Sequence, residues 1–125
     1  MKFNFQTYTG YTRMSTVVPQ ITISKSGNIG LNKAFAKAEG VGYYGASELS
    51  FDKVRGLIGI RFQEEKKNGA MKLLPTKNGS YFISGTGFLH AFNLDSKKLR
   101  GNYEPQKFTD EDGVKMYFID VDRKI

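Results

Sequence analysis

The stretch ITISKSGNIGLNKAF, residues 21–35, decides how this chain can fold. Ile21 and Ile23 alternate with polar residues, which is typical of a strand with one buried face. The sequence Ser-Gly-Asn that follows has the composition of a tight turn, and the alternation resumes at Ile29 and Leu31. The stretch therefore predicts a strand, a turn and a return strand.

A helix is predicted directly after the return strand. Asn32 can cap it, because an asparagine side chain accepts hydrogen bonds from amides in the first turn of a helix. The segment KAFAKAEG places alanine, phenylalanine and lysine at helical spacing and ends at Gly40, a residue suited to a left-handed helix end.

A similar pattern returns in LLPTKNGSYFISGTGF, residues 73–88. Lys25 and Gly27 align with Lys77 and Gly79, and further aligned pairs include Phe51 with Phe108 and Gly56 with Gly113. A single unit of this length could hardly bury both a sheet face and a helix, whereas two units can cover each other. The interpretation is a β-β-α-β-β unit used twice. Two ordinary α+β halves remain the alternative.

The fold class expected is α+β, with antiparallel sheets packed on two helices. Residues 1–16 are predicted to be a loosely ordered N-terminal arm, and residues 17–125 a single domain made of two pseudo-repeats, 17–63 and 70–122. Further expected elements are strands at 43–51, 57–62, 71–77 and 80–84, a charged connector at 64–69, a helix at 87–93, and a closing hairpin of NYEPQKFT and VKMYFIDV around DEDG.

The composition narrows the classes of function. Among 125 residues there are no cysteines and one histidine, which excludes thiol chemistry and argues against most metal centres. No apolar run approaches the roughly 18 residues of a membrane helix, and the N-terminus lacks the apolar stretch of a signal peptide. We expect a soluble, cytoplasmic protein with no membrane partner.

Motifs for catalysis are missing from the sequence. GNIGLNK at 27–33 lacks the spacing and ending of a phosphate loop, and GTGFLH at 85–90 has only two glycines of a dinucleotide fingerprint. The acidic cluster at 110–112 lacks the ligand periodicity of a calcium loop. The prediction is a protein that is not an enzyme, with no catalytic residues, no cofactor and no metal.

Charge and aromatic content favour nucleic acid as the partner. The formal net charge is +7, and ten phenylalanines and seven tyrosines lie among the lysines. Single-stranded nucleic acid binds to surfaces that offer cations to its phosphates and rings to its bases. On LIGIRF, the alternation predicts Ile58, Ile60 and Phe62 in the core and Arg61 outside.

On VKMYFIDV, the same reasoning predicts Val114, Met116 and Phe118 in the core and Lys115 and Tyr117 outside. The candidate binding residues are cations and tyrosines on or beside predicted strands and turns: Lys25, Lys33, Tyr43, Tyr44, Arg55, Arg61, Lys72, Lys77, Tyr81, Tyr103, Lys107, Lys115 and Tyr117.

Two families resemble this pattern. The unit ITISKSGNIGLNKAFAKAEGV, followed by a strand pair ending in LIGIRF, resembles the swapped-hairpin DNA-binding fold of AbrB and MazE-type transcription factors. Asn32-Lys33 stands where that family usually has Pro-Lys, and Asn28 stands where its arginine is expected.

Over residues 17–122, the chain is more similar to the single-stranded-DNA-binding fold of the Whirly and positive-cofactor-four type, including small phage proteins related to it. This resemblance implies sequence-independent binding of single-stranded DNA, in phage replication or recombination, in the cytoplasm of a bacterial host. The alternatives are a duplex-binding regulator of the AbrB type and a non-enzymatic protein-interaction module. Competition by RNA and assembly into a homo-oligomer are left open.

Overall fold

The computed structural model describes residues 18–64, 69–109 and 111–125 of the chain. The predicted arm at 1–16 and most of the connector at 64–69 therefore lie outside the described residues. The elements that follow are α+β in class, as expected: two antiparallel sheets and, among the described residues, three α-helices and one 3-10 turn.

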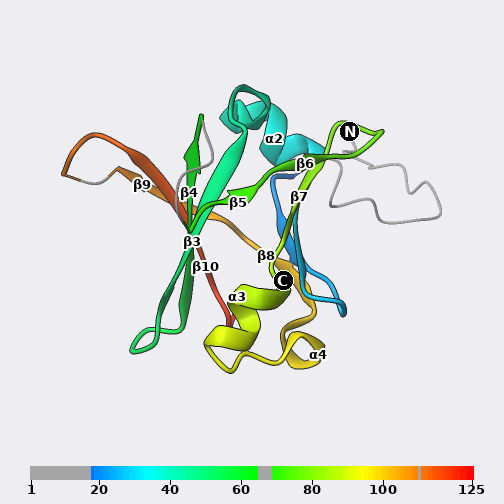
Figure 1. Cartoon of the computed structure of the whole chain (residues 1–125), viewed down its shortest axis with the longest axis vertical. Coiled ribbons are helices and arrows are strands. Elements are labelled where there is room, and N and C mark those ends of the chain that lie inside the picture. The colour runs from blue at the N-terminus through cyan, green and yellow to red at the C-terminus, as the bar shows by residue number, and fades with distance from the viewer. Residues whose placement is uncertain (1–17, 65–68, 110) are drawn as a thin grey trace, which may run out of the picture.

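Two five-stranded sheets form the body of the molecule (Figure 1). Sheet A has the order β6-β7-β2-β1-β8, and sheet B has the order β5-β3-β4-β10-β9. The strands of sheet A are β1 (Ile21–Ile23), β2 (Asn28–Leu31), β6 (Leu74–Pro75), β7 (Tyr81–Ser84) and β8 (Gly101–Tyr103). Those of sheet B are β3 (Ala46–Asp52), β4 (Leu57–Gln63), β5 (Met71–Lys72), β9 (Gln106–Thr109) and β10 (Lys115–Asp120).

The stretch at 21–35 folds as the sequence predicts. β1 and β2 form an antiparallel hairpin, and Gly27 at its turn has φ of 93°. Helix α2 (Lys33–Glu39) begins after Asn32, whose side chain accepts a hydrogen bond from the amide of Phe35 at 2.9 Å. Gly40 ends the helix with φ of 65°, in the left-handed region that glycine adopts without a steric penalty.

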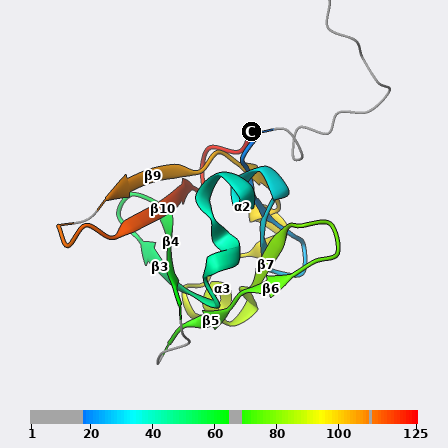
Figure 2. The same cartoon turned by 90° about the horizontal axis from the view of Figure 1, so that it is seen from above.

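Helix α2 lies between the two sheets and closes one end of the core (Figure 2). Its Phe35 is 1% exposed, and its ring centroid lies 5.1 Å from that of Tyr117 and 6.2 Å from that of Phe62. Buried residues from both sheets join this helix in one hydrophobic cluster. The helix that follows β7 lies at the opposite end of the molecule (Figure 1).

Two segments predicted as single strands are each divided between the sheets. MKLLPTK supplies β5 to sheet B and β6 to sheet A, and NYEPQKFT supplies β8 to sheet A and β9 to sheet B. Pro105 lies at the second division, and a proline has no N–H to continue a ladder. Buried Leu73 lies at the first division.

The helical segments also differ from the prediction. Helix α3 (Thr86–Ala91) is shorter than expected, and Asn93 adopts φ of 55° shortly after it ends. Helix α4 (Ser96–Leu99) was not predicted. Asp95 caps it by accepting a hydrogen bond from the amide of Lys97 at 3.0 Å. The strand expected at 43–51 begins only at Ala46, and Tyr43 belongs instead to the 3-10 turn η1 (Val41–Tyr43).

The two faces of β10 are the reverse of the prediction. Tyr117 is 3% exposed and Ile119 fully buried, whereas Met116 and Phe118 are half-buried on the other face. Tyr117 lies opposite Ile60 of β4. Both faces of this strand carry large apolar side chains, so alternation did not distinguish them. On β4, the prediction of Ile58, Ile60 and Phe62 as core is confirmed.

Candidate nucleic-acid interface

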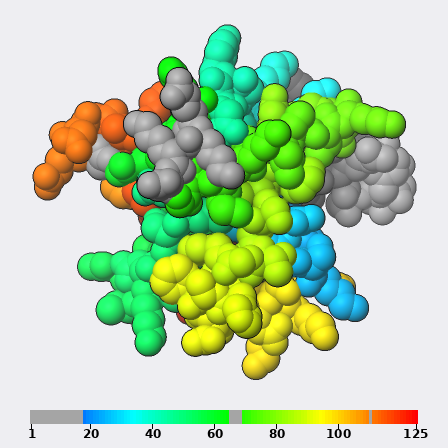
Figure 3. All heavy atoms as spheres, in the orientation of Figure 1, coloured from blue at the N-terminus to red at the C-terminus, as the bar shows by residue number. Residues whose placement is uncertain are grey.

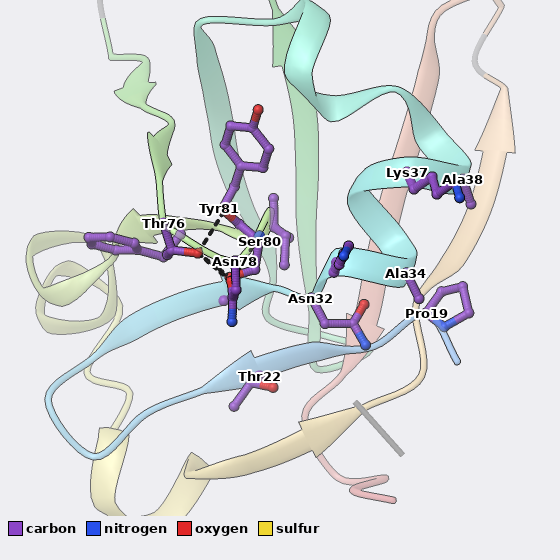
Figure 4. A pocket seen from close by; sticks show the side chains of 14 residues that line it. Pro19, Thr22, Asn32, Ala34, Lys37, Ala38, Thr76, Asn78, Ser80 and Tyr81 are labelled. Carbon is purple, nitrogen blue, oxygen red and sulfur yellow. Dashed lines mark hydrogen bonds between the residues drawn. The ribbon is translucent and has the colours of Figure 1, made fainter. Parts of the chain in front are cut away.

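A groove of about 1040 Å³ lies between helix α2, the β6–β7 turn and the outward face of sheet A (Figure 4). The outward face is the one turned away from the core, and it presents Thr22, Gly30 and Phe82 in neighbouring strands. The groove is lined by Pro19, Thr22, Gly30, Leu31, Asn32, Lys33, Ala34, Lys37, Ala38, Thr76, Asn78, Ser80, Tyr81 and Phe82.

The charge of the lining is entirely positive. Lys33 and Lys37 lie four residues apart on α2, so they lie on the same side of the helix, and both are exposed. None of the lining residues is an aspartate or a glutamate. A groove with two cations and no carboxylate in its lining attracts anions.

The β6–β7 turn forms a polar wall of the groove. Thr76, Asn78 and Ser80 point toward one another in Figure 4, and the Oγ1 of Thr76 lies 2.6 Å from Asn78 Oδ1 and 2.7 Å from Ser80 Oγ. A Cβ built on Gly79 would lie 3.5 Å from Cγ of Lys33, so the stem of that lysine packs beside the turn. The hydrogen bonds order the turn, and the stem of Lys33 lies against it.

Two aromatic residues line the groove from adjacent positions of β7. Phe82 is half-buried and lies between Gly30 of β2 and Leu74 of β6 in the sheet register, so its neighbour on the β2 side has no side chain. Tyr81 is also half-buried, and its hydroxyl lies 3.0 Å from a Cβ built on Gly42. Because Tyr81 lies opposite the buried Leu31 and packs against the core, Phe82 on the outward face is the ring better placed to stack on a base beside the lysines.

The structure brings only part of the predicted set together. Lys33 and Tyr81 line the groove, and Lys77 lies in the turn that forms its wall. Sequence reasoning missed Lys37 and Phe82. The spacing of Lys37 from Lys33 could have shown that both lie on one helix face. Phe82 could not have been found, because its face of the strand depends on how β7 pairs with β2.

The other exposed candidates lie elsewhere. Tyr43 is 88% exposed in the 3-10 turn, and Tyr44 stacks on Phe62 with centroids 5.6 Å apart. Arg55 pairs with Asp52 at 2.9 Å. The remaining exposed or half-buried candidates outside the groove are Lys25 in the β1–β2 turn, Arg61 and Lys72 on sheet B, and Lys107 and Lys115 on the β9–β10 hairpin.

Two predicted tyrosines are buried and do not form part of a surface. Tyr103 is fully buried, and its hydroxyl donates to the carbonyl of Leu99. Tyr117 donates its hydroxyl hydrogen to Oε1 of Glu39 at 2.6 Å. A buried tyrosine hydroxyl needs a hydrogen-bond partner, and each of these two has an acceptor inside the fold that the sequence did not reveal.

Glu39, at the end of α2, joins the helix to the β9–β10 hairpin. Besides Tyr117, its Oε1 lies 3.0 Å from Nζ of Lys107. Burial raises the pKa of Glu39, but hydrogen bonds from Tyr117 and Lys107 and the charges of Lys107 and Lys115 outweigh it, so the pKa is lowered overall. Burial and the bond to Glu39 raise the pKa of Tyr117.

Glu39→Gln is expected to reduce the free energy of unfolding by about 1 kcal/mol near neutral pH, because the charged acceptor is lost. Folding lowers the pKa of Glu39. The extra stability of the wild type over Glu39→Gln is therefore fully present above the unfolded-state pKa near 4.5, and it disappears as the pH falls through the folded-state pKa. Urea unfolding at several pH values tests this. Glu104→Gln, at an exposed position, is the control. If the wild type remained more stable than Glu39→Gln in acid, the charge of Glu39 would not be the source of the difference.

Two features with functional meaning are absent among the described residues. No group of three or more potential metal-ligating side chains gathers among them, and none of their helices has the length and apolarity to cross a membrane. In comparisons with known proteins, the chain matches no family model, no curated protein and no solved structure.

Proposed function

We propose that this protein binds single-stranded DNA, with little sequence preference, in the groove beside helix α2. The observation that carries the proposal is the lining itself, with Lys33 and Lys37 and no carboxylate, together with the ring of Phe82 on the outward face. A flexible strand can place its phosphates on the lysines while a base stacks on an aromatic side chain. Hydroxyl and amide groups of the β6–β7 turn add hydrogen-bonding partners.

Low sequence preference follows from the kind of contacts proposed. Phosphates are the same at every nucleotide, and each base has a ring face that can stack. The cellular role, by resemblance, is phage DNA replication or recombination in the cytoplasm of a bacterial host. This role and the likeness to Whirly proteins rest on the sequence pattern.

We also propose that the fold is the same β-β-α-β-β unit used twice about an approximate two-fold axis. The β1–β2 and β6–β7 hairpins meet through β2 and β7, and the β3–β4 and β9–β10 hairpins meet through β4 and β10. The hairpin tips of the two halves point in opposite directions, with α2 and α3 at opposite ends (Figure 1).

A reciprocal contact supports this relation between the halves. Cβ atoms built on the turn glycines Gly27 and Gly79 would lie 3.0 Å from Oγ1 of Thr86 and 3.5 Å from Cγ of Lys33. Thr86 and Lys33 are the first residues of α3 and α2. Each half therefore packs its hairpin turn against the start of the other half's helix.

The nature of the ligand can be tested on the wild-type chain by fluorescence anisotropy. We expect labelled oligo-dT and a mixed-sequence single strand to bind alike, and more tightly than duplex DNA, with affinity that falls steeply with salt. An RNA competitor measures the preference for DNA. Tighter binding to duplex would instead indicate a regulator of the AbrB type, and binding to neither at low salt would indicate a protein-interaction module.

Lys33→Ala/Lys37→Ala is expected to weaken binding to oligo-dT roughly tenfold at low salt and to flatten the salt dependence. Two lost phosphate contacts reduce the slope of log K against log salt by about 1.4 for a single strand. Alanine keeps the helix. The control is Lys97→Ala/Lys98→Ala, which removes the same charge from exposed positions of α4. Equal losses in the two variants would mean that net charge, and not the groove, determines affinity.

A further inference from the structure

The outward face of sheet B is a second surface that the groove does not include. Cross-strand pairing places Glu48, Arg61, Met116 and Phe108 in one row across β3, β4, β10 and β9. The next row consists of Ser50, Gly59, Phe118 and Gln106. Except for Gly59, these residues are exposed or half-buried.

The centre of this face is apolar. Phe108 is 44% exposed, and its ring centroid lies 5.9 Å from that of the half-buried Phe118. A Cβ built on Gly59 would lie 2.7 Å from Cε of Met116, so the methionine folds over the glycine beside these rings. Adjoining phenylalanine and methionine side chains surrounded by polar residues are typical of protein–protein interfaces.

The charges around this centre include both signs. Glu48, Asp52 and Asp120 lie on the outward face together with Arg61 and Lys72. Asp52 and Asp120 are also paired with Arg55 at 2.9 Å and Arg123 at 3.4 Å. With these two arginines counted, three acids and four bases surround the apolar centre, so this face carries both signs of charge, whereas the lining of the groove carries cations alone.

Charges of both signs around an apolar centre suit contact with a second copy of the same chain. In a two-fold dimer the same patch meets itself, so the patch must supply both partners of each charge pair. Acids and cations around one apolar centre meet this requirement. A surface of one sign would repel its own copy.

The sheet edge beside this face is protected against pairing. β9 is the edge strand of sheet B, and its Lys107 points toward the core side, where it pairs with Glu39 at 3.0 Å. An inward-pointing charge on an edge strand disfavours the addition of another strand. At this edge, contact through the face is therefore favoured over the addition of a strand.

We propose that two copies of this chain associate through the outward face of sheet B, with Phe108, Phe118 and Met116 at the centre of the interface. The β9–β10 hairpin, which carries all three residues, projects from the body of the molecule (Figure 3). The groove beside α2 is lined by other residues and stays accessible. A dimer thus presents two grooves, which raises the affinity for strands long enough to reach both.

Sedimentation equilibrium of the full chain over a range of concentrations tests the dimer without any nucleic acid. We expect a mass of two 14.1 kDa chains for the wild type and at least a tenfold weaker association for Phe108→Asp and for Phe108→Ser. Thermal unfolding at low concentration checks that the variants fold. Tyr43→Ser, at another exposed aromatic residue outside this face, should leave association unchanged.

Two outcomes would overturn the proposal. The first is a wild-type chain that stays monomeric up to submillimolar concentration; if Phe108→Ser then also weakens binding to a short oligo-dT, the face is a base-stacking surface. The second is a wild-type dimer that the Phe108 variants leave intact. Failure of oligo-dT binding with an intact, Phe108-dependent dimer would overturn the proposed function alone.

Discussion

Phe35→Ala is expected to reduce the free energy of unfolding by about 3–5 kcal/mol, the largest effect of any single substitution considered for this fold. The side chain is 1% exposed and contacts the rings of Phe62 and Tyr117 between the two sheets. Its removal leaves a cavity where helix α2 joins the core. A loss of this size is a large fraction of the stability of a small domain. Urea unfolding followed by circular dichroism measures it.

Two control variants separate the packing effect from effects on the helix. Phe35→Leu keeps most of the buried volume and is expected to cost clearly less. Lys37→Ala changes an exposed position of the same helix and is expected to shift stability by less than about 0.5 kcal/mol. A Phe35→Ala variant as stable as Lys37→Ala would mean that α2 is not an integral part of the core.

Phe82→Ala is expected to weaken binding to a short oligo-dT by about 1–3 kcal/mol, which is roughly 5- to 150-fold. The proposed reason is loss of the ring on which a base stacks in the groove. Phe82→Tyr keeps the ring and should retain affinity, whereas Phe82→Leu keeps bulk without aromaticity and should lose it. Anisotropy titration at constant salt gives the three values.

The comparison for this substitution is Tyr43→Ala, which removes a more exposed ring outside the lining of the groove. It should leave affinity unchanged. If Tyr43→Ala lowers affinity and Phe82→Ala does not, bases stack outside the groove and the proposed site is wrong. Thermal unfolding of Phe82→Ala checks that any loss reflects the surface and not the fold.

The structure of the segment that contains β1, β2 and α2 could be predicted directly from its sequence. The alternation at Ile21, Ile23, Ile29 and Leu31 and the cap at Asn32 act over a few residues, so local rules were sufficient. The positive-φ glycines at the turns are local features of the same kind. The faces of β4 were also predicted, because only one of them is continuously apolar.

The candidate site was predicted less well, for a different reason. Lys33 and Tyr81 are almost fifty residues apart in sequence, and only the pairing of β2 with β7 brings their elements to one groove. On β10, Tyr117 and Phe118 are both aromatic, and alternation alone assigned each to the wrong face. In the fold Tyr117 lies opposite the buried Ile60, and its hydroxyl has an acceptor in the carboxylate of Glu39 at 2.6 Å.

The sequence by itself determined the hairpins, the capped helix α2, the absence of cysteine chemistry and the net charge of +7, since these depend on neighbouring residues or on composition. Tertiary structure alone decided that MKLLPTK and NYEPQKFT each supply a strand to both sheets. It also decided which tyrosines are buried, and that cations and aromatic side chains line one groove. These features depend on long-range strand pairing and on partners for buried polar groups, which local pattern does not specify.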